Sequence, residues 1–167
     1  SRRRAQKMRI EDAKMVLDYA ADIQKKLRTI AAEKDLLEGD LNCLRGIEYG
    51  GMPHGSGHSD STADIAQRAE ELGSLDRLRE LEVQEVVLRG DFAAIRAQIW
   101  SLKTVYTTVI SELWLCGHSS EETAHKIGYS VSHTKRIKAE ALVRLAESLD
   151  DMPQAEEIRA RAYNARK

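Results

Sequence analysis

Apolar residues recur every three and four positions between residues 10 and 48, which is the heptad pattern of a helix that packs along another helix. The a positions are Ala13, Ala20, Leu27, Lys34 and Leu41, and the d positions are Val16, Ile23, Ile30, Leu37 and Leu44. Only Lys34 is polar, and a lone polar a residue commonly fixes register at a cost in stability. The pattern predicts one long helix that lies along another helix of the chain or along a second copy.

A glycine-rich loop over residues 49–61 is expected to end this helix. It contains His54 and His58, but a glycine-rich loop fixes no ligand geometry and neither cysteines nor carboxylates complete a site, so no metal is predicted. From Thr62 the helical pattern resumes and continues to Leu102, with Gly90 as a candidate position for a kink or break. Residues 10–102 are therefore predicted to form a long helical hairpin or coiled-coil oligomerisation region.

Shorter helices are expected over residues 103–149. An apolar helix is followed by Gly117, and the stretch Ser119 to Glu122 has the sequence of a capping box that starts a helix over residues 120–127. Gly128 then marks a tight turn, and Ser130 is placed to cap a last helix over residues 131–149. The whole fold is thus predicted to be all-α, with a helix-turn-helix DNA-binding domain at residues 103–149.

Polar and cationic residues gather on the side of the last helix opposite its apolar face. Hydroxyl, imidazole, ammonium and guanidinium groups suit base edges and phosphates, and an α-helix fits the major groove of duplex DNA. The candidate DNA-binding residues are Ser130, Val131, Ser132, His133, Lys135, Arg136 and Lys138. A second basic cluster lies in residues 1–9, which are expected to form a flexible arm that contacts phosphate or only aids solubility. Residues 150–167 are expected to form a short helical or flexible tail.

The stretch from Gly128 to Leu142 resembles the last helix-turn-helix of bacterial sigma factors, region four, through Gly128, the capping hydroxyl, Ile137 and the Ala-x-Ala-Leu run. With the preceding helices and the Gly-Met-Pro loop, residues 10–149 look like phage-encoded transcriptional regulators of the RinA/ArpU type. This resemblance implies a sequence-specific activator of phage late or packaging genes. It also implies that Val131, Ser132, His133, Lys135 and Arg136 face a promoter element. Thr123 and Thr134 depart from the pattern, since they stand where an aliphatic core residue is usual.

Composition narrows the remaining possibilities. The 167 residues carry a net charge of −1, so attraction to nucleic acid has to come from local patches. No apolar run is long enough for a membrane span, and Cys43 and Cys116 are expected to be reduced, buried thiols of a cytoplasmic protein in a bacterial host or phage-infected cell. Trp100 and Trp114 are expected to be packing residues. No phosphate-binding loop, nucleophile elbow or Cys-His pairing is recognisable, so neither an enzyme nor a cofactor is predicted.

The expected partners are double-stranded DNA and further copies of the chain, as a dimer or tetramer, with host RNA polymerase as an additional candidate. Two alternatives to a transcriptional regulator stay open. The first is a DNA-packaging component like a small terminase subunit, and the second is a module that binds another protein such as RNA polymerase. The order of the chain disfavours the packaging alternative, since in small terminase subunits the DNA-binding motif usually precedes the assembly helices.

Overall fold

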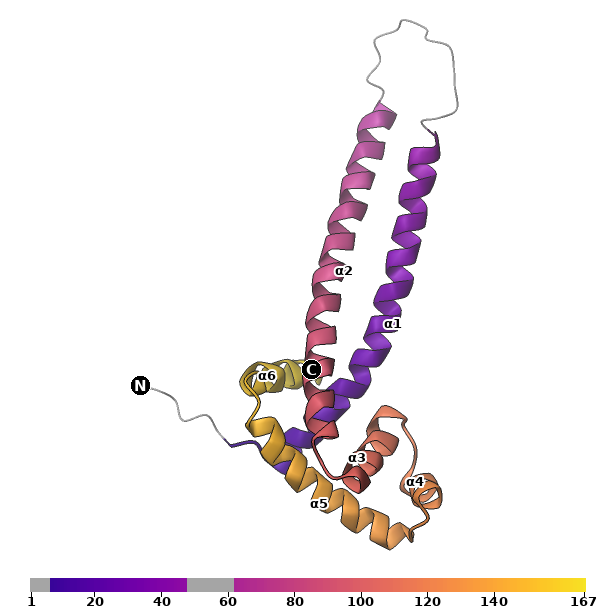
Figure 1. Ribbon diagram of the computed structural model, residues 1–167. Coiled ribbons are helices and arrows are strands. Elements are labelled where there is room, and N and C mark those ends of the chain that lie inside the picture. Colours follow the sequence, from indigo (N-terminus) through magenta and orange to yellow (C-terminus); the bar gives the residue numbers. More distant parts are fainter. Residues whose placement is uncertain (1–6, 48–61) are drawn as a thin grey trace, which may run out of the picture. The chain divides into compact units, whose positions relative to one another are not determined.

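The computed structural model describes residues 7–47 and 62–167, and over these residues it contains helices and no strands (Figure 1). The predicted all-α class is confirmed for this part of the chain. The elements are α1 (Ile10–Ile47), α2 (Thr62–Trp100), α3 (Thr104–Ile110), the π-helical turn η1 (Ser111–Leu115), α4 (Ser120–Ile127), α5 (Val131–Asp150) and α6 (Ala155–Ala165). None of the described helices is long and apolar enough to cross a lipid bilayer.

The long helices largely follow the predicted pattern. α1 covers the predicted heptads, and α2 continues through Gly90, so the helix does not break there. All ten heptad positions of α1 are buried or half-buried, including Lys34. The glycine-rich loop with His54 and His58, and the arginines at the start of the basic arm, lie outside the described residues.

The chain divides into two compact units, each of which contains part of both long helices. Residues 1–25 and 89–167 form the first, which we call the core unit, and residues 26–88 form the second, which we call the hairpin unit. The heptad positions from Ala13 to Ile23 thus belong to the core unit, together with the C-terminal helices.

The core unit is built around apolar side chains from the start of α1, the end of α2, α3, α5 and α6. Fully buried examples are Leu17, Ile23, Ile95, Ile99, Ile110, Leu145, Leu149 and Ile158. Asp91 of α2 lies among them and accepts two hydrogen bonds from the Arg161 guanidinium, both at 2.7 Å, and one from the Tyr19 hydroxyl at 2.8 Å. A buried carboxylate is tolerated when it is paired and hydrogen-bonded in this way. The three side chains join α1, α2 and α6.

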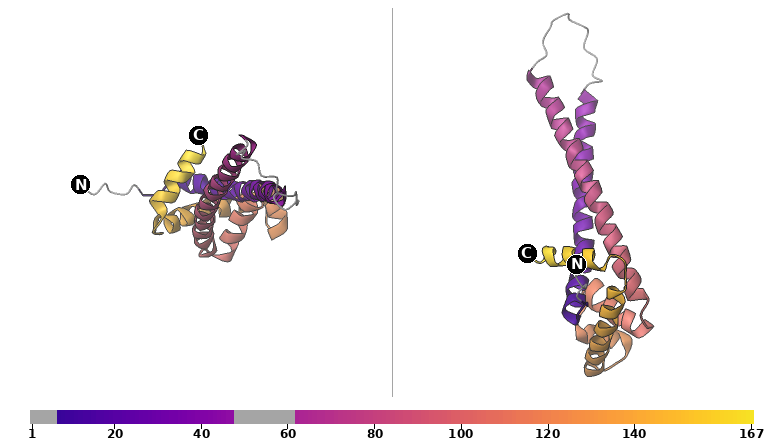
Figure 2. Two further views of the ribbon diagram at one scale, coloured as in Figure 1. Left: turned by 90° about the horizontal axis from the view of Figure 1, so that it is seen from above. Right: turned by 90° about the vertical axis from the view of Figure 1, so that its left-hand side faces the viewer.

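The hairpin unit consists of two helical segments that run side by side in opposite directions (Figures 1 and 2). Among its described apolar side chains, Ile30, Leu41 and Leu81 are buried. Salt bridges supplement this small core: Lys34 pairs with Glu85 at 3.0 Å, and Arg77 pairs with Glu33 at 2.7 Å. The polar a residue Lys34 therefore has a carboxylate partner on the opposite helix.

Three side chains are placed differently from the sequence prediction. Cys43 and Cys116 are free thiols, as expected, but both are exposed and not buried. Trp100 is the last residue of α2 and is 64% exposed, so it is not a core residue. Trp114 is half-buried and donates a hydrogen bond from Nε1 to Asp18 at 3.1 Å. These differences arise because helical spacing predicts which side of a helix a residue occupies. It does not predict whether another element covers that residue.

Candidate nucleic-acid interface

The beginning of α4 is fixed by the predicted capping box. The Glu122 backbone N–H donates to Ser119 Oγ at 3.1 Å, and the Glu122 carboxylate accepts from the Ser119 backbone N–H at 2.7 Å. Both bonds satisfy N–H groups that a helix end otherwise leaves unpaired. The backbone N–H of Ser119 holds the pKa of the Glu122 carboxyl below its usual value. α4 therefore starts at a defined residue, which sets the position of the turn that follows.

The turn between α4 and α5 depends on Gly128. Its φ of 73° lies in the left-handed region, where a residue with a Cβ is disfavoured. The backbone N–H of Tyr129 donates to the Ala124 carbonyl at 3.1 Å and closes the end of α4. Ser130 then caps α5, because its Oγ accepts from the His133 backbone N–H at 3.2 Å. The predicted starts of both helices, Ser120 and Val131, are confirmed.

The inner faces of α4 and α5 pack together through small and aliphatic residues. Thr123, Ala124, Thr134, Ile137, Ala141 and Leu142 are all buried. The Thr134 hydroxyl donates to the Ser130 carbonyl at 3.0 Å, whereas the buried Thr123 hydroxyl has no hydrogen-bond partner among the described residues. The two threonines that depart from the sigma-factor pattern are thus both core residues, and within this part of the chain only one of them is satisfied.

The outer face of α5 carries the predicted contact residues at different depths. Ser132, Lys135 and Arg136 are exposed, as is Ser130, while Val131, His133 and Lys138 are half-buried. Ser132, Lys135 and Arg136 are spaced by three and four residues, so they share one side of the helix. This side lies opposite the buried Ile137 and Ala141. The first turns of α5 therefore present one hydroxyl and two cations to solvent on a rigid support.

Two of the half-buried residues are engaged within the protein. The His133 ring meets the Tyr129 ring edge-on, with centroids 4.8 Å apart, and its Nδ1 lies 3.3 Å from the Arg136 guanidinium. Lys138 Nζ lies 5.1 Å from the centroid of the Trp114 ring, within the range of a cation–π contact. His133 is thus placed to orient Arg136, and Lys138 is partly occupied by Trp114. The contacts of His133 are with residues three and four positions away in the sequence, whereas the sequence gives no signal for the contact of Lys138 with Trp114, since it depends on how separate elements pack.

The polar surface continues along α5 with residues of mixed charge. Glu140 lies one turn after Arg136 and accepts a hydrogen bond from the Tyr106 hydroxyl at 3.1 Å, which raises the pKa of that phenol. Arg144 pairs with Glu147 at 3.5 Å. The cationic character of the exposed face is therefore confined to the beginning of the helix, where its N-terminal N–H groups also attract anions.

A second cluster of chemically active side chains lies just before α4. Glu112, Cys116 and His118 bring their ligand atoms within 4.8 Å of one another, and these are side-chain types that bind zinc. Glu112 is also bonded to both His118 and Lys126, and the pKa of its carboxyl is lowered by the hydrogen bonds from His118 and then Lys126. Pairing with Glu112 accounts for the position of His118, and Cys116 is an exposed free thiol beside them. The trio was not predicted from the sequence, because its spacing matches no common metal motif.

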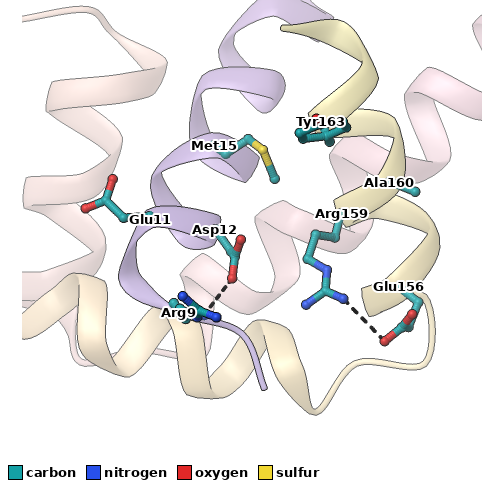
Figure 3. A pocket seen from close by; sticks show the side chains of 8 residues that line it. All are labelled: Arg9, Glu11, Asp12, Met15, Glu156, Arg159, Ala160 and Tyr163. Atoms are coloured by element: carbon teal, nitrogen blue, oxygen red, sulfur yellow. Dashed lines mark hydrogen bonds and ion pairs between the residues drawn. The ribbon is translucent and has the colours of Figure 1, made fainter. Parts of the chain in front are cut away.

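A cavity of about 520 Å³ lies between α1 and α6 in the core unit (Figure 3). It is lined by Arg9, Glu11, Asp12, Met15, Glu156, Arg159, Ala160 and Tyr163. Two of its carboxylates are engaged locally, since Asp12 accepts a hydrogen bond from the Arg9 backbone N–H at 2.9 Å and Glu156 lies 3.6 Å from Arg159. Cations and carboxylates both line the cavity, so it does not concentrate charge of one sign as an anion or cation site would.

Comparison with known proteins returned no relative. No protein-family model matches the chain, and no curated protein or solved structure shows significant similarity to it. The resemblance to RinA/ArpU-type regulators therefore stays a prediction from the residues between Gly128 and Leu142 and the preceding helical pattern. The exposed surface of α5 is therefore the structural feature that bears most directly on function.

Proposed function

We propose that this protein is a sequence-specific, double-stranded-DNA-binding transcriptional regulator that inserts the first turns of α5 into the major groove. One observation carries the proposal: Ser132, Lys135 and Arg136 are exposed together on a helix whose opposite side is anchored by Thr134, Ile137 and Ala141. A helix can read a groove only if its outward side chains are accessible while its axis is held by a core. Both conditions are met at this position.

Each exposed group has a distinct role in this proposal. Arg136 is the residue for a bidentate contact to guanine O6 and N7, the commonest specific contact of a guanidinium in the major groove. The His133 ring beside it restricts the guanidinium and lowers the entropy lost on binding. Lys135 supplies a phosphate or guanine contact, and Ser132 supplies a hydroxyl that donates or accepts. The backbone N–H groups at the start of α5 face a phosphate.

The regulatory role follows from the resemblance to sigma region four and to RinA/ArpU-type proteins. In this proposal the protein is an activator of phage late or packaging genes, acting in the cytoplasm of the bacterial host. It binds as a homo-oligomer, a dimer or tetramer, and contacts host RNA polymerase at the promoter. A dimer would read two half-sites, which adds affinity and length to a site that one helix reads over only a few base pairs.

The test is selection of bound duplexes from a random pool with the full chain, followed by footprinting on the recovered sequence. Arg136→Ala and Lys135→Ala should each weaken binding to that sequence by about 1–3 kcal/mol, the usual worth of one good base contact, without loss of helicity. Arg144→Ala is the matched control, because Arg144 is an exposed arginine of the same helix that pairs with Glu147. It should leave the specific affinity nearly unchanged.

Other results would point to the alternative functions. Unchanged binding in both α5 variants, or a pool without an enriched sequence, would refute this use of the helix. Large closed rings in solution would favour a packaging component. Capture of RNA polymerase by a protein that binds no duplex at low salt would favour a protein-interaction module.

A further inference from the structure

Within the hairpin unit, α2 carries two heptad seams on opposite sides. The inner seam is buried or half-buried and consists of Gln67, Glu71, Ser74, Leu78, Leu81, Glu85 and Leu88. The outer seam is exposed at every position and consists of Ile65, Ala69, Leu72, Asp76, Arg79, Val83 and Val86. Corresponding positions of the two seams differ by two residues, which is about 200° around a helix of 3.6 residues per turn. The outer seam therefore points away from the inner one.

The inner seam is the one that meets α1. Glu85 pairs with Lys34 across the hairpin, and the Gln67 side chain donates to the Leu44 carbonyl. Four of its seven positions are polar, whereas five of the seven outer positions are apolar. Ile65, Leu72, Val83 and Val86 are each between 62% and 71% exposed. A regular apolar seam of this length on an exposed helix is typical of a surface that another helix covers.

The outer seam contains two residues of opposite charge, and their positions suit a second copy of α2. Asp76 and Arg79 lie at its centre, between Leu72 and Val83, where their side chains are about three-quarters exposed and approach each other to 3.9 Å within one helix. If a second copy of α2 packs antiparallel around a two-fold axis midway between them, the Asp76 of each copy faces the Arg79 of the other. The same symmetry sets Leu72 of one copy against Val83 of the other, and Ala69 against Val86. The surface is complementary to itself, as a two-fold interface requires.

We propose that the outer seam of α2, from Ile65 to Val86, is a homodimer interface in which two copies of α2 pack antiparallel. A parallel pair would place the two Asp76 carboxylates against each other and likewise the two Arg79 guanidinium groups, which the like charges oppose. The proposal rests on the self-association part of the proposed function and is independent of its DNA-binding part. It names the surface and the direction of the pairing, neither of which follows from the heptads of α1.

Sedimentation equilibrium of the full chain tests the interface. Val86→Glu puts a carboxylate into the apolar seam twice per dimer, so the dimer dissociation constant should rise by about 100-fold because each buried charge is left unpaired. Leu36→Glu is the matched control: Leu36 lies on α1 and is 71% exposed, the same fraction as Val86. It should leave the dissociation constant unchanged. A wild-type chain that stays monomeric, or equal effects of the two variants, would overturn the proposal.

A charge exchange tests the direction of pairing. Asp76→Arg alone sets two guanidinium groups against each other on both sides of the axis, and Arg79→Asp alone does the same with carboxylates, so each should weaken the dimer by about tenfold. The double variant restores both opposite-charge contacts and should return the dissociation constant to the wild-type value. Failure of the double variant to recover would exclude the antiparallel register.

The two proposals fail separately. Circular dichroism on each variant shows whether the helices persist, and DNA binding is measured on the same samples. If the dissociation constants do not change as predicted but the protein binds the selected duplex, only the interface proposal is overturned. If the dissociation constants change as predicted but the protein binds no duplex, only the DNA-binding proposal is overturned.

Discussion

The core unit and the hairpin unit use the same long helices but are held together differently. In the described part of the hairpin unit only three apolar side chains are buried, Ile30, Leu41 and Leu81, whereas all the other buried apolar residues of the described chain belong to the core unit. Partly exposed salt bridges between its helices supplement these few buried side chains. A regular heptad pattern thus predicts which side of a helix packs, but the amount of buried surface, which determines stability, depends on the partner that it meets.

The largest expected effect comes from removing a buried apolar side chain, and it should differ between the two units. Leu145→Ala should lower the free energy of unfolding by about 3–5 kcal/mol, because Leu145 is fully buried in the core unit and its removal leaves a cavity. Leu81→Ala in the hairpin unit should cost about 2 kcal/mol, since the two-helix surroundings can close or admit water. Urea unfolding monitored by circular dichroism measures both. An equal loss for the two variants would contradict the contrast between the units.

The core unit and the hairpin unit also differ in how deeply their ion pairs are buried. Asp91→Asn removes the carboxylate that Arg161 and Tyr19 share inside the core unit, and should cost about 2 kcal/mol, below the range for a fully buried pair because Arg161 is partly exposed. Glu33→Gln removes the carboxylate that Arg77 contacts in the hairpin unit, where water screens the pair, so the change should be much smaller. Thermal unfolding of both variants decides this. A larger loss from Glu33→Gln would reverse the interpretation.

The buried tyrosine gives the core unit a pH dependence of its own. Burial first, and then the hydrogen bond to Asp91, raises the pKa of Tyr19 well above its usual 10.0. Above pH 10 the unfolded chain loses this proton while the folded protein keeps it, so stability should fall as pH rises, by up to about 1.4 kcal/mol per pH unit. Below pH 10 this contribution is fully present. The stability of Tyr19→Phe, measured from about pH 8 to about pH 11, should fall less steeply than that of wild type; parallel curves would refute this.

The smallest expected effect is an increase in the free energy of unfolding. Thr123→Val replaces a buried hydroxyl that has no partner within the described chain by a methyl group of similar size, and should stabilise the protein by about 1 kcal/mol. Thr134→Val is the matched control, since it removes a hydroxyl that does bond to the Ser130 carbonyl and should bring no gain. Denaturant midpoints for the two variants compare them directly. A loss of stability in Thr123→Val would show that the hydroxyl is satisfied in solution.

Local signals in the sequence predicted the helix starts that frame the candidate site. The capping box at Ser119, the left-handed Gly128 and the cap at Ser130 each act through bonds within a few residues, so the starts of α4 and α5 were predictable. The exposure of Ser132, Lys135 and Arg136 also follows from helical spacing once the apolar side is known. The helix starts do not depend on the rest of the fold.

Features that depend on contacts between distant segments were not predictable. Periodicity cannot say that Ala13 to Ile23 belong with the C-terminal helices, or that Lys138 lies over Trp114. The exposure of Cys116 and Trp100 was missed for the same reason, since an apolar residue on a helix is buried only where another element covers it. α2 continues through Gly90, so the cost of about 1 kcal/mol for one glycine does not break the helix there.

Asp91 also sets an order of events during protein synthesis. Its partners Tyr19 and Arg161 lie 72 residues before it and 70 residues after it in the chain. On the ribosome, the first segment of α1 and the end of α2 emerge long before α6, so the carboxylate waits without its guanidinium until residue 161 has left the exit tunnel. The core unit therefore closes only after α6 has emerged, and the apolar side of α1 lacks part of its cover until then.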